Sequence, residues 1–303
     1  METKKIFLVI LFIGFVSYSQ QDAQYTQYMY NTETINPAYA GSRGVLSIFG
    51  LYRAQWVGLD GAPKTGAFSI NSPIENTNIG VGLTVLNDQI GPTVNSSISA
   101  DLSYTIKTSD AYKLSFGVKG TANFFNFNRD KLNPQVITDP TLANLNNYYS
   151  PNLGAGAYLH SNKGYLGLSV PNFFQSKMYN DNEYAIYEQK INLYLIGGYV
   201  FDFSPDIKFK PAFLVKTVEG APLQLDLSGN ILFNEKFMVG AAYRLDAAAS
   251  LMAGFQVSEG LYIGYGYDLD TTRLAHYNSG SHEIFLRYEF FKHKNRIVSP
   301  RFF

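Results

Sequence analysis

Cysteine is absent from the 303 residues of this chain. Its absence excludes disulfides, a lipid-modified N-terminal cysteine and thiolate metal sites. Charged residues are scarce as well, at 16%, and the 24 Lys and Arg balance the 24 Asp and Glu. A nucleic-acid-binding protein needs a basic face, so we expect no nucleic-acid partner. Beyond residue 16, no apolar run reaches the roughly 20 residues that a membrane-spanning helix requires.

Residues 1–19 have the three parts of a secretory signal peptide. Lys4 and Lys5 make the start basic, residues 6–16 form an apolar run, and residues 17–19 resemble a small-x-small cleavage site. The alternative is an uncleaved membrane anchor, but the apolar run is short for a membrane span. We therefore expect an exported protein whose mature chain begins at Gln20.

Most of the remaining chain alternates apolar residues with polar or small ones, which is the period of a β-strand with two different faces. The predicted strands cover residues 44–56, 64–71, 78–87, 93–107, 111–124, 150–160, 164–170, 190–203, 206–217, 223–228, 237–244, 250–257, 261–268 and 283–290. Most of them are longer than the typical 5–6 residues of strands in soluble domains, and approach the roughly 9–11 residues that cross a bilayer. The pattern predicts an all-β protein, a transmembrane antiparallel β-barrel of about 14 strands in the outer membrane of a Gram-negative bacterium.

The lengths of the connections support a barrel. The three longest, residues 126–149, 171–189 and 269–280, are connections 5, 7 and 13 along the chain, so all of them leave the same end of the predicted barrel. Outer-membrane barrels have short periplasmic turns and long surface loops. A soluble β-protein is the alternative, but it would need another reason for long strands and one-sided loops. We expect a barrel over residues 45–291, with residues 20–44 and a basic tail, residues 292–303, on the periplasmic side.

Candidates for catalysis and metal binding are few. Ser281 and His282 are the one pair that resembles a hydrolase site, but no Gly-x-Ser-x-Gly motif accompanies them. Asp268 and Asp270 offer oxygen ligands for calcium, although Asp is also common in turns. The sequence contains neither His-Glu-x-x-His nor a nucleotide-binding glycine loop. We expect no enzymatic activity, no cofactor and no metal.

The polar faces of the predicted strands carry charges of both signs. About eight strands suffice for side chains alone to fill a barrel, so a barrel of about 14 holds either water or a plug. In an open pore these charges set the ion preference; in a filled barrel they pair with each other and with the plug. The predicted lumen charges are Arg53, Asp101, Lys107, Lys113, Lys119, Lys208, Lys210, Lys216, Asp226, Arg244, Asp268, Glu283, Arg287 and Glu289.

The segment that precedes the first strand carries the most specific motif. Residues 21–28 read QDAQYTQY, and residues 36–42 read NPAYAGS. Together with YRAQW at 52–56, GAP at 61–63, GYGYD at 264–268 and GSHEI at 280–284, these strings resemble the PorP/SprF family. The motif residues at the predicted periplasmic mouth are Gln24, Tyr25, Gln27, Tyr28, Asn36, Pro37, Ala38, Tyr39 and Gly41. Residues 126–189 carry no motif of the family.

The resemblance implies a non-enzymatic outer-membrane protein of type IX secretion. Members of this family assist the secretion or the surface anchoring of cargo, often adhesins with a type IX C-terminal domain, and are linked to gliding motility. The implied partners are that cargo, periplasmic secretion and motility components, and outer-membrane lipid. A diffusion porin or small-solute transporter is the alternative function. We expect residues 20–44 to fold into or across the periplasmic mouth, where their amides and Tyr hydroxyls contact Arg53 and Arg244.

Overall fold

The computed structural model describes residues 26–128, 148–179 and 185–291. The predicted signal peptide, the predicted tail at 292–303, and the motif residues Gln24 and Tyr25 lie outside these ranges. Within the described ranges, no helix is long and apolar enough to span a membrane.

The described chain is almost entirely β-structure. Its strands are β1 Leu46–Ala54, β2 Lys64–Pro73, β3 Ile79–Ile90, β4 Thr93–Lys107, β5 Lys113–Phe127, β6 Tyr148–His160, β7 Gly164–Val170, β8 Ser176–Tyr179, β9 Ala185–Gln189, β10 Asn192–Tyr199, β11 Phe201–Asp202, β12 Ile207–Val218, β13 Gln224–Phe233, β14 Phe237–Arg244, β15 Ala248–Gln256, β16 Leu261–Asp270 and β17 Ser281–Phe290. Four short 3-10 helices accompany them: η2 Tyr28–Tyr30, η3 Thr32–Thr34, η4 Pro37–Tyr39 and η7 Arg273–His276.

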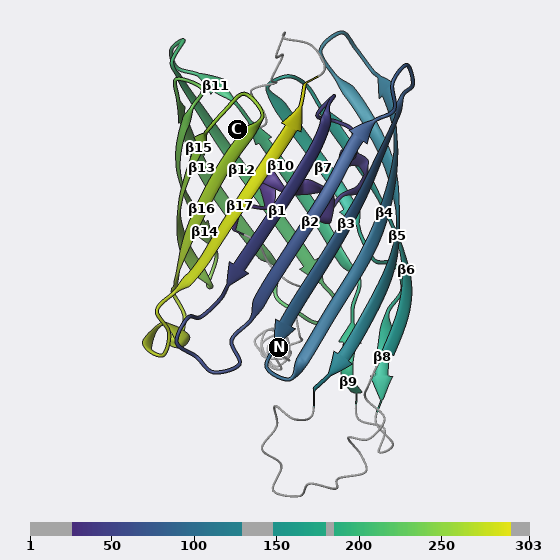
Figure 1. Cartoon of the computed structure of the whole chain (residues 1–303), viewed down its shortest axis with the longest axis vertical. Coiled ribbons are helices and arrows are strands. Elements are labelled where there is room, and N and C mark those ends of the chain that lie inside the picture. Colours follow the sequence, from purple (N-terminus) through teal and green to yellow (C-terminus); the bar gives the residue numbers. More distant parts are fainter. Residues whose placement is uncertain (1–25, 129–147, 180–184, 292–303) are drawn as a thin grey trace, which may run out of the picture.

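The strands close into one antiparallel barrel (Figure 1). Strands that follow each other around the wall also follow each other in the chain, and the barrel closes where β1 pairs with β17. β10 and β11 are consecutive pieces of one wall strand, because both pair with β12. The wall therefore has 14 strands, as predicted. β8 and β9 pair only with each other and form a separate hairpin.

The barrel has two rims that differ in their connections. We call the rim where β1 begins and β17 ends proximal, and the opposite rim distal; in Figure 1 the proximal rim is at the top. The three longest connections all join strands at the distal rim. Short turns such as 161–163 and 234–236 join strands at the proximal rim. The prediction that the long connections share one end of the barrel is confirmed.

The two faces of the wall have opposite character, because side chains alternate along each strand. Outward-facing Leu102, Phe116 and Leu251 are 51%, 51% and 63% exposed. Lumen-facing charged residues such as Arg53 and Glu283 are 2% and 1% exposed. This is the reverse of a soluble protein and is the pattern of a barrel whose outer surface meets lipid.

The structure differs from the sequence prediction at the ends of most strands, usually by one to three residues, and in two loops. Strand β13 continues to Phe233, well beyond the predicted end at residue 228. The loop predicted at 171–189 contains the hairpin β8–β9, and the loop at 269–280 contains η7. Lys107 and Lys113 lie on the polar face of their strands, as expected, but at the proximal ends of β4 and β5, where both are exposed and Lys107 pairs with Asp110.

Candidate functional site: a plugged lumen

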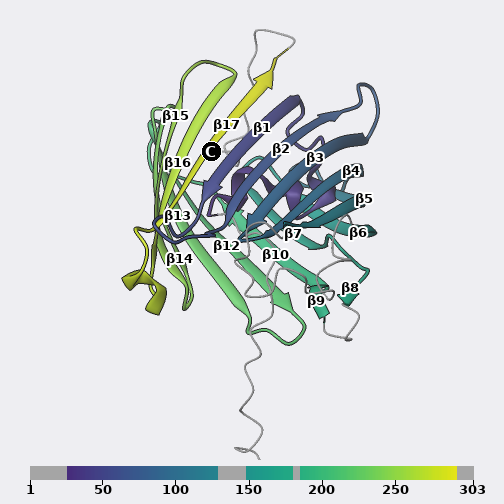
Figure 2. The ribbon, with the colours of Figure 1, turned by 60° about the horizontal axis from the view of Figure 1, so that its bottom comes forward.

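Residues 26–44, which we call the plug, lie inside the barrel. In Figures 1 and 2 they are the short purple coils enclosed by the wall. Nearly all residues from Thr26 to Ala40 are buried. The plug is not confined to one mouth: Thr26 contacts residues near the distal rim, and Arg43 contacts β17 near the proximal rim. The predicted plug therefore reaches further into the barrel than its expected place at the mouth.

The Asn36-Pro37 pair shapes the middle of the plug. The side-chain oxygen of Asn36 accepts a hydrogen bond from the Ala38 N–H at 3.0 Å and so caps η4. Pro37 takes the first helical position, where it loses no hydrogen bond because that N–H has no partner in a helix. The Asn36 amide also donates to the carbonyl of Ala157 in β6 at 3.1 Å. One side chain thus caps the start of η4 and attaches the plug to the wall.

Glycines in the wall make room for the plug. A Cβ atom on Gly117 of β5 would lie 2.3 Å from the Ala38 nitrogen, and one on Gly80 of β3 would lie 2.2 Å from the Ala40 carbonyl oxygen. A Cβ on Gly156 of β6 would lie 2.2 Å from Asn36 Oδ1. Contacts this short are not possible for a real Cβ atom, so only glycine fits where the plug backbone and wall meet. Three further glycines face plug side chains in the same way: Gly82 (Glu33), Gly167 (Asn36) and Gly266 (Gln27).

An ionic cluster near the distal rim attaches the first plug residues. Arg53 of β1 contacts Asp268 of β16 at 2.6 Å and Glu283 of β17 at 3.1 Å. The Thr26 hydroxyl donates to Asp268 and accepts from Arg53 at 2.9 Å. The N–H groups of Thr26 and Gln27 donate to the Glu283 carboxylate at 3.1 and 3.0 Å. The plug therefore adds three hydrogen-bond donors to two buried carboxylates that share one guanidinium.

A second cluster holds the middle of the plug against β2, β4 and β5. The Lys119 ammonium donates to the carbonyls of Glu33 and Thr34 at 3.0 and 3.1 Å, and lies 3.5 Å from Asp101. Asn71 donates to the Glu33 carboxylate at 2.6 Å. Lys119 thus joins a lumen carboxylate to the plug backbone, and Lys119, Asp101, Glu33 and Asn71 are all buried.

A third cluster lies toward the proximal rim. The Arg43 guanidinium contacts Glu289 of β17, and Arg287 lies 3.8 Å from the same carboxylate. Arg287 also lies over the rings of Tyr30 and Tyr262, with its central carbon 5.7 and 4.9 Å from the ring centroids. Cations over aromatic faces gain electrostatic attraction, most of all where water is excluded.

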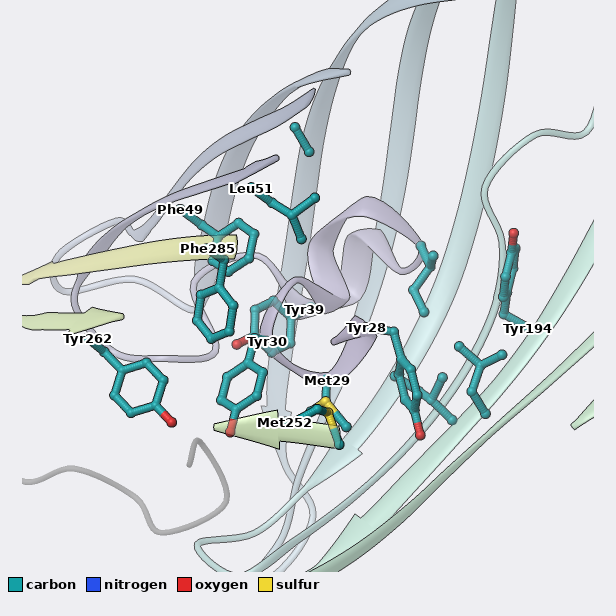
Figure 3. Close-up of a cluster of buried hydrophobic side chains, with 14 of the residues drawn as sticks. Tyr28, Met29, Tyr30, Tyr39, Phe49, Leu51, Tyr194, Met252, Tyr262 and Phe285 are labelled. Carbon is teal, nitrogen blue, oxygen red and sulfur yellow. The ribbon is translucent and has the colours of Figure 1, made fainter. Parts of the chain in front are cut away.

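Aromatic packing joins the plug to the β1 and β17 side of the wall. Figure 3 shows Tyr30 of the plug beside Tyr262 and Phe285, with Phe49 above Phe285. Tyr30 stacks on Phe285 at 4.7 Å between centroids, and Phe49 stacks on Phe285 at 5.2 Å. Buried aromatics contribute both area and specific ring contacts, so the lumen has a packed interior rather than only a charged one.

Six of the fourteen predicted lumen charges form three pairs of opposite sign that lie directly opposite each other on neighbouring strands. Arg53 is opposite Glu283, Asp101 opposite Lys119, and Asp226 opposite Arg244. The Arg244 to Asp226 distance is 2.9 Å. At Arg53 the plug contact differs from the one expected, because the guanidinium meets the Thr26 hydroxyl rather than an amide or a Tyr hydroxyl.

Sequence reasoning missed several plug contacts. Thr26, Glu33 and Arg43 were not among the candidate residues, although each forms a polar contact between plug and wall. Gly117 was not singled out either. The sequence feature that could have identified it is a glycine on the polar face of a strand that is otherwise rich in bulky residues. Gly80 and Gly156 have the same feature.

The geometry gives no support to the hydrolase and calcium alternatives. Neighbouring residues of a strand face opposite sides, so Ser281 faces the lumen while His282 faces outward and contacts the Tyr265 hydroxyl at 2.6 Å. They cannot act as a nucleophile and its base. Asp268 is taken by Arg53 and Thr26, and Asp270 accepts from the Trp56 indole at 3.3 Å. Within the described ranges, no group of acidic, His or Cys residues is arranged to hold a metal ion.

These observations define the class as an outer-membrane β-barrel with a segment of its own chain in the lumen. The family model described as type IX secretion system membrane protein PorP/SprF matches residues 17–288. The chain therefore belongs to the PorP/SprF family. This assignment points to a membrane barrel of a secretion system rather than to an enzyme.

Solved structures share the fold at low sequence identity. The CymD monoaromatic hydrocarbon channel is 10% identical with a TM-score of 0.51, and the match covers 89% of this chain and 94% of that one. The outer membrane protein Omp33 of Acinetobacter baumannii is 8% identical with a TM-score of 0.47, covering 81% and 98%. No curated protein sequence matched. At 10% identity the likeness to CymD shows the fold of an outer-membrane barrel and nothing about the substrate.

Proposed function

We propose that this protein is a closed barrel that assists the type IX secretion system in secreting its cargo or anchoring it at the cell surface. The cargo would carry a type IX C-terminal domain, as adhesins used in gliding motility do. The proposed orientation places the distal rim, with its long connections, outside the cell, and the proximal rim in the periplasm. Family membership supports the role in type IX secretion.

The plug is the observation that carries the proposal of a closed barrel. Its backbone lies against glycines of β3 and β5, its Asn36 side chain lies against a glycine of β6, and its polar groups join clusters at both ends and in the middle of the lumen. A diffusion porin or small-solute transporter, the alternative, requires an open path through the same space. The filled lumen favours a platform over a channel. In this function the barrel presents its distal loops to cargo and contacts periplasmic partners at its proximal rim.

The proposal predicts a cargo defect in a deletion strain. In a bacterium that carries the type IX system, we would delete the gene and locate adhesins in whole cells, periplasm and culture fluid. Retention in the periplasm would assign the protein to export, and release into the culture fluid would assign it to anchoring. Complementation with the wild-type gene is the control. Normal surface display of every adhesin in the deletion strain would refute the proposal.

Conductance separates the two functions. We expect the purified barrel to show no stable ion conductance in planar bilayers, because the plug occupies the lumen. A chain that lacks residues 26–44, tested in the same bilayers, serves as the positive control for an emptied lumen. Stable conductance of the wild-type barrel would favour the porin.

A further inference from the structure

The barrel closes between strands that no turn connects. Every other neighbouring pair in the described wall is also consecutive in the chain, but β1 and β17 are the first and last wall strands. In hairpins the turn helps to fix the register of pairing, whereas at this seam the register must come from side chains. The observed register places Arg53 opposite Glu283 and Ser47 opposite Glu289.

Alternation of faces cannot fix this register alone. A slip of one residue would turn every side chain to the wrong face, so the lipid-facing pattern excludes it. A slip of two residues keeps each side chain on its own face. Arg53 would then lie opposite Ser281 or Phe285, and Glu283 opposite Leu51 or Gln55, which leaves a buried carboxylate without its guanidinium.

Ionic contacts mark both ends of the seam. Arg53, near the end of β1, contacts Glu283, and Arg43, shortly before β1, contacts Glu289. All four side chains are nearly inaccessible to water, with exposures of 2%, 0%, 3% and 6%. Breaking a buried ion pair by removing one partner is strongly destabilising. Both contacts therefore penalise a two-residue slip in either direction.

We propose that the ion pairs Arg53–Glu283 and Arg43–Glu289 set the register in which the barrel closes. Thr26 and Gln27 of the plug donate to the same Glu283 carboxylate, so the closed seam and the seated plug are held by one cluster. These two ion pairs position β1 against β17, and this role does not depend on which cargo the protein serves.

Disulfide trapping in isolated outer membranes tests the proposal, because the chain has no cysteine of its own. Outward-facing Ile48 and Tyr288 lie directly opposite each other, so I48C/Y288C reports the native register. I48C/L286C and I48C/F290C report the two slips of two residues. Directly opposite residues have Cα atoms about 4.5–5.5 Å apart, within disulfide range, whereas diagonal ones are about 7–8 Å apart.

The deciding variant is Arg53→Met, with Arg244→Met as matched control. Arg244 forms a similar pair with Asp226, but its strands are joined by the turn at 234–236. In the heat-resistant, folded fraction we expect R53M to raise the ratio of slipped to native cross-links by about tenfold or more, and R244M to leave it unchanged. A ratio in R53M equal to that in wild type would overturn the proposal. If R53M yields no folded barrel, E283Q, which keeps the shape and removes the charge, is judged by the same ratio.

Discussion

The contact between Gly117 and the plug allows the most direct test of how the lumen is filled. In Gly117→Ala the new Cβ would lie 2.3 Å from the Ala38 nitrogen and 2.4 Å from the Pro37 carbonyl carbon. Ordinary Cβ contacts begin at 3.4 Å. The plug or β5 must therefore move by roughly 1 Å, and the atoms in the way are backbone, which cannot rotate aside as a side chain can.

A control in the same strand isolates this steric cost. Gly120 faces outward, and a Cβ there meets nothing within 4 Å. Both substitutions reduce the freedom of the unfolded chain by the same amount, roughly 0.4–1 kcal/mol, so this effect cancels in the comparison. We expect G117A to be less stable than G120A by about 1–3 kcal/mol, which is the usual cost of overpacking an interior.

The measurement is urea unfolding in lipid vesicles, followed by the difference in gel mobility between folded and unfolded barrel. Planar-bilayer conductance of the same samples reports whether the plug has moved, and we expect leak currents in G117A and none in G120A. Equal stability of the two variants, with equal and negligible conductance, would show that the plug does not press against the wall at this glycine.

Two further substitutions, measured by the same unfolding assay, test the plug contacts. Asn36→Ala removes the cap on η4 and the hydrogen bond to Ala157, so we expect a loss of about 1–2 kcal/mol; Asn87→Ala, which removes an exposed hydrogen bond, should cost under about 0.5 kcal/mol. A cost in N36A no greater than in N87A would contradict the capping role. Phe285→Ala removes the ring that stacks on plug and wall and should cost about 3–5 kcal/mol, clearly more than Leu286→Ala on the outward face; equal costs would argue against a packed lumen.

The strands could be predicted from the sequence because the two faces of a barrel wall have different surroundings, lipid outside and the lumen inside. β4, β7 and β14 have the bounds that alternation alone predicts. Ten of the fourteen predicted lumen charges, Arg53 and Asp226 among them, are buried on the polar face as predicted. The prediction is wrong where the alternation is weak. The sequence predicts a loop over the residues of the hairpin β8–β9, whose strands pair with each other and not with the wall.

The plug could be predicted only in part from the sequence. The Asn36-Pro37 turn signal and the lack of alternation before residue 45 set the segment apart from the strands. Neither signal tells how far the segment extends along the lumen or which groups it meets. That depends on where six wall glycines from five strands leave space, and on residues far apart in the chain, such as Thr26 and Asp268, meeting across the lumen.

The sequence by itself determined that this is a β-barrel of 14 strands with an apolar outside and a charged inside, since period-two alternation is a local property of each strand. Its motifs also indicated the PorP/SprF family. The tertiary structure alone decided that the barrel is filled by residues 26–44, which charge pairs with which, and where the first strand meets the last. Those outcomes depend on closure of the wall, which brings the first and last strands together and leaves an interior too wide for its own side chains to fill.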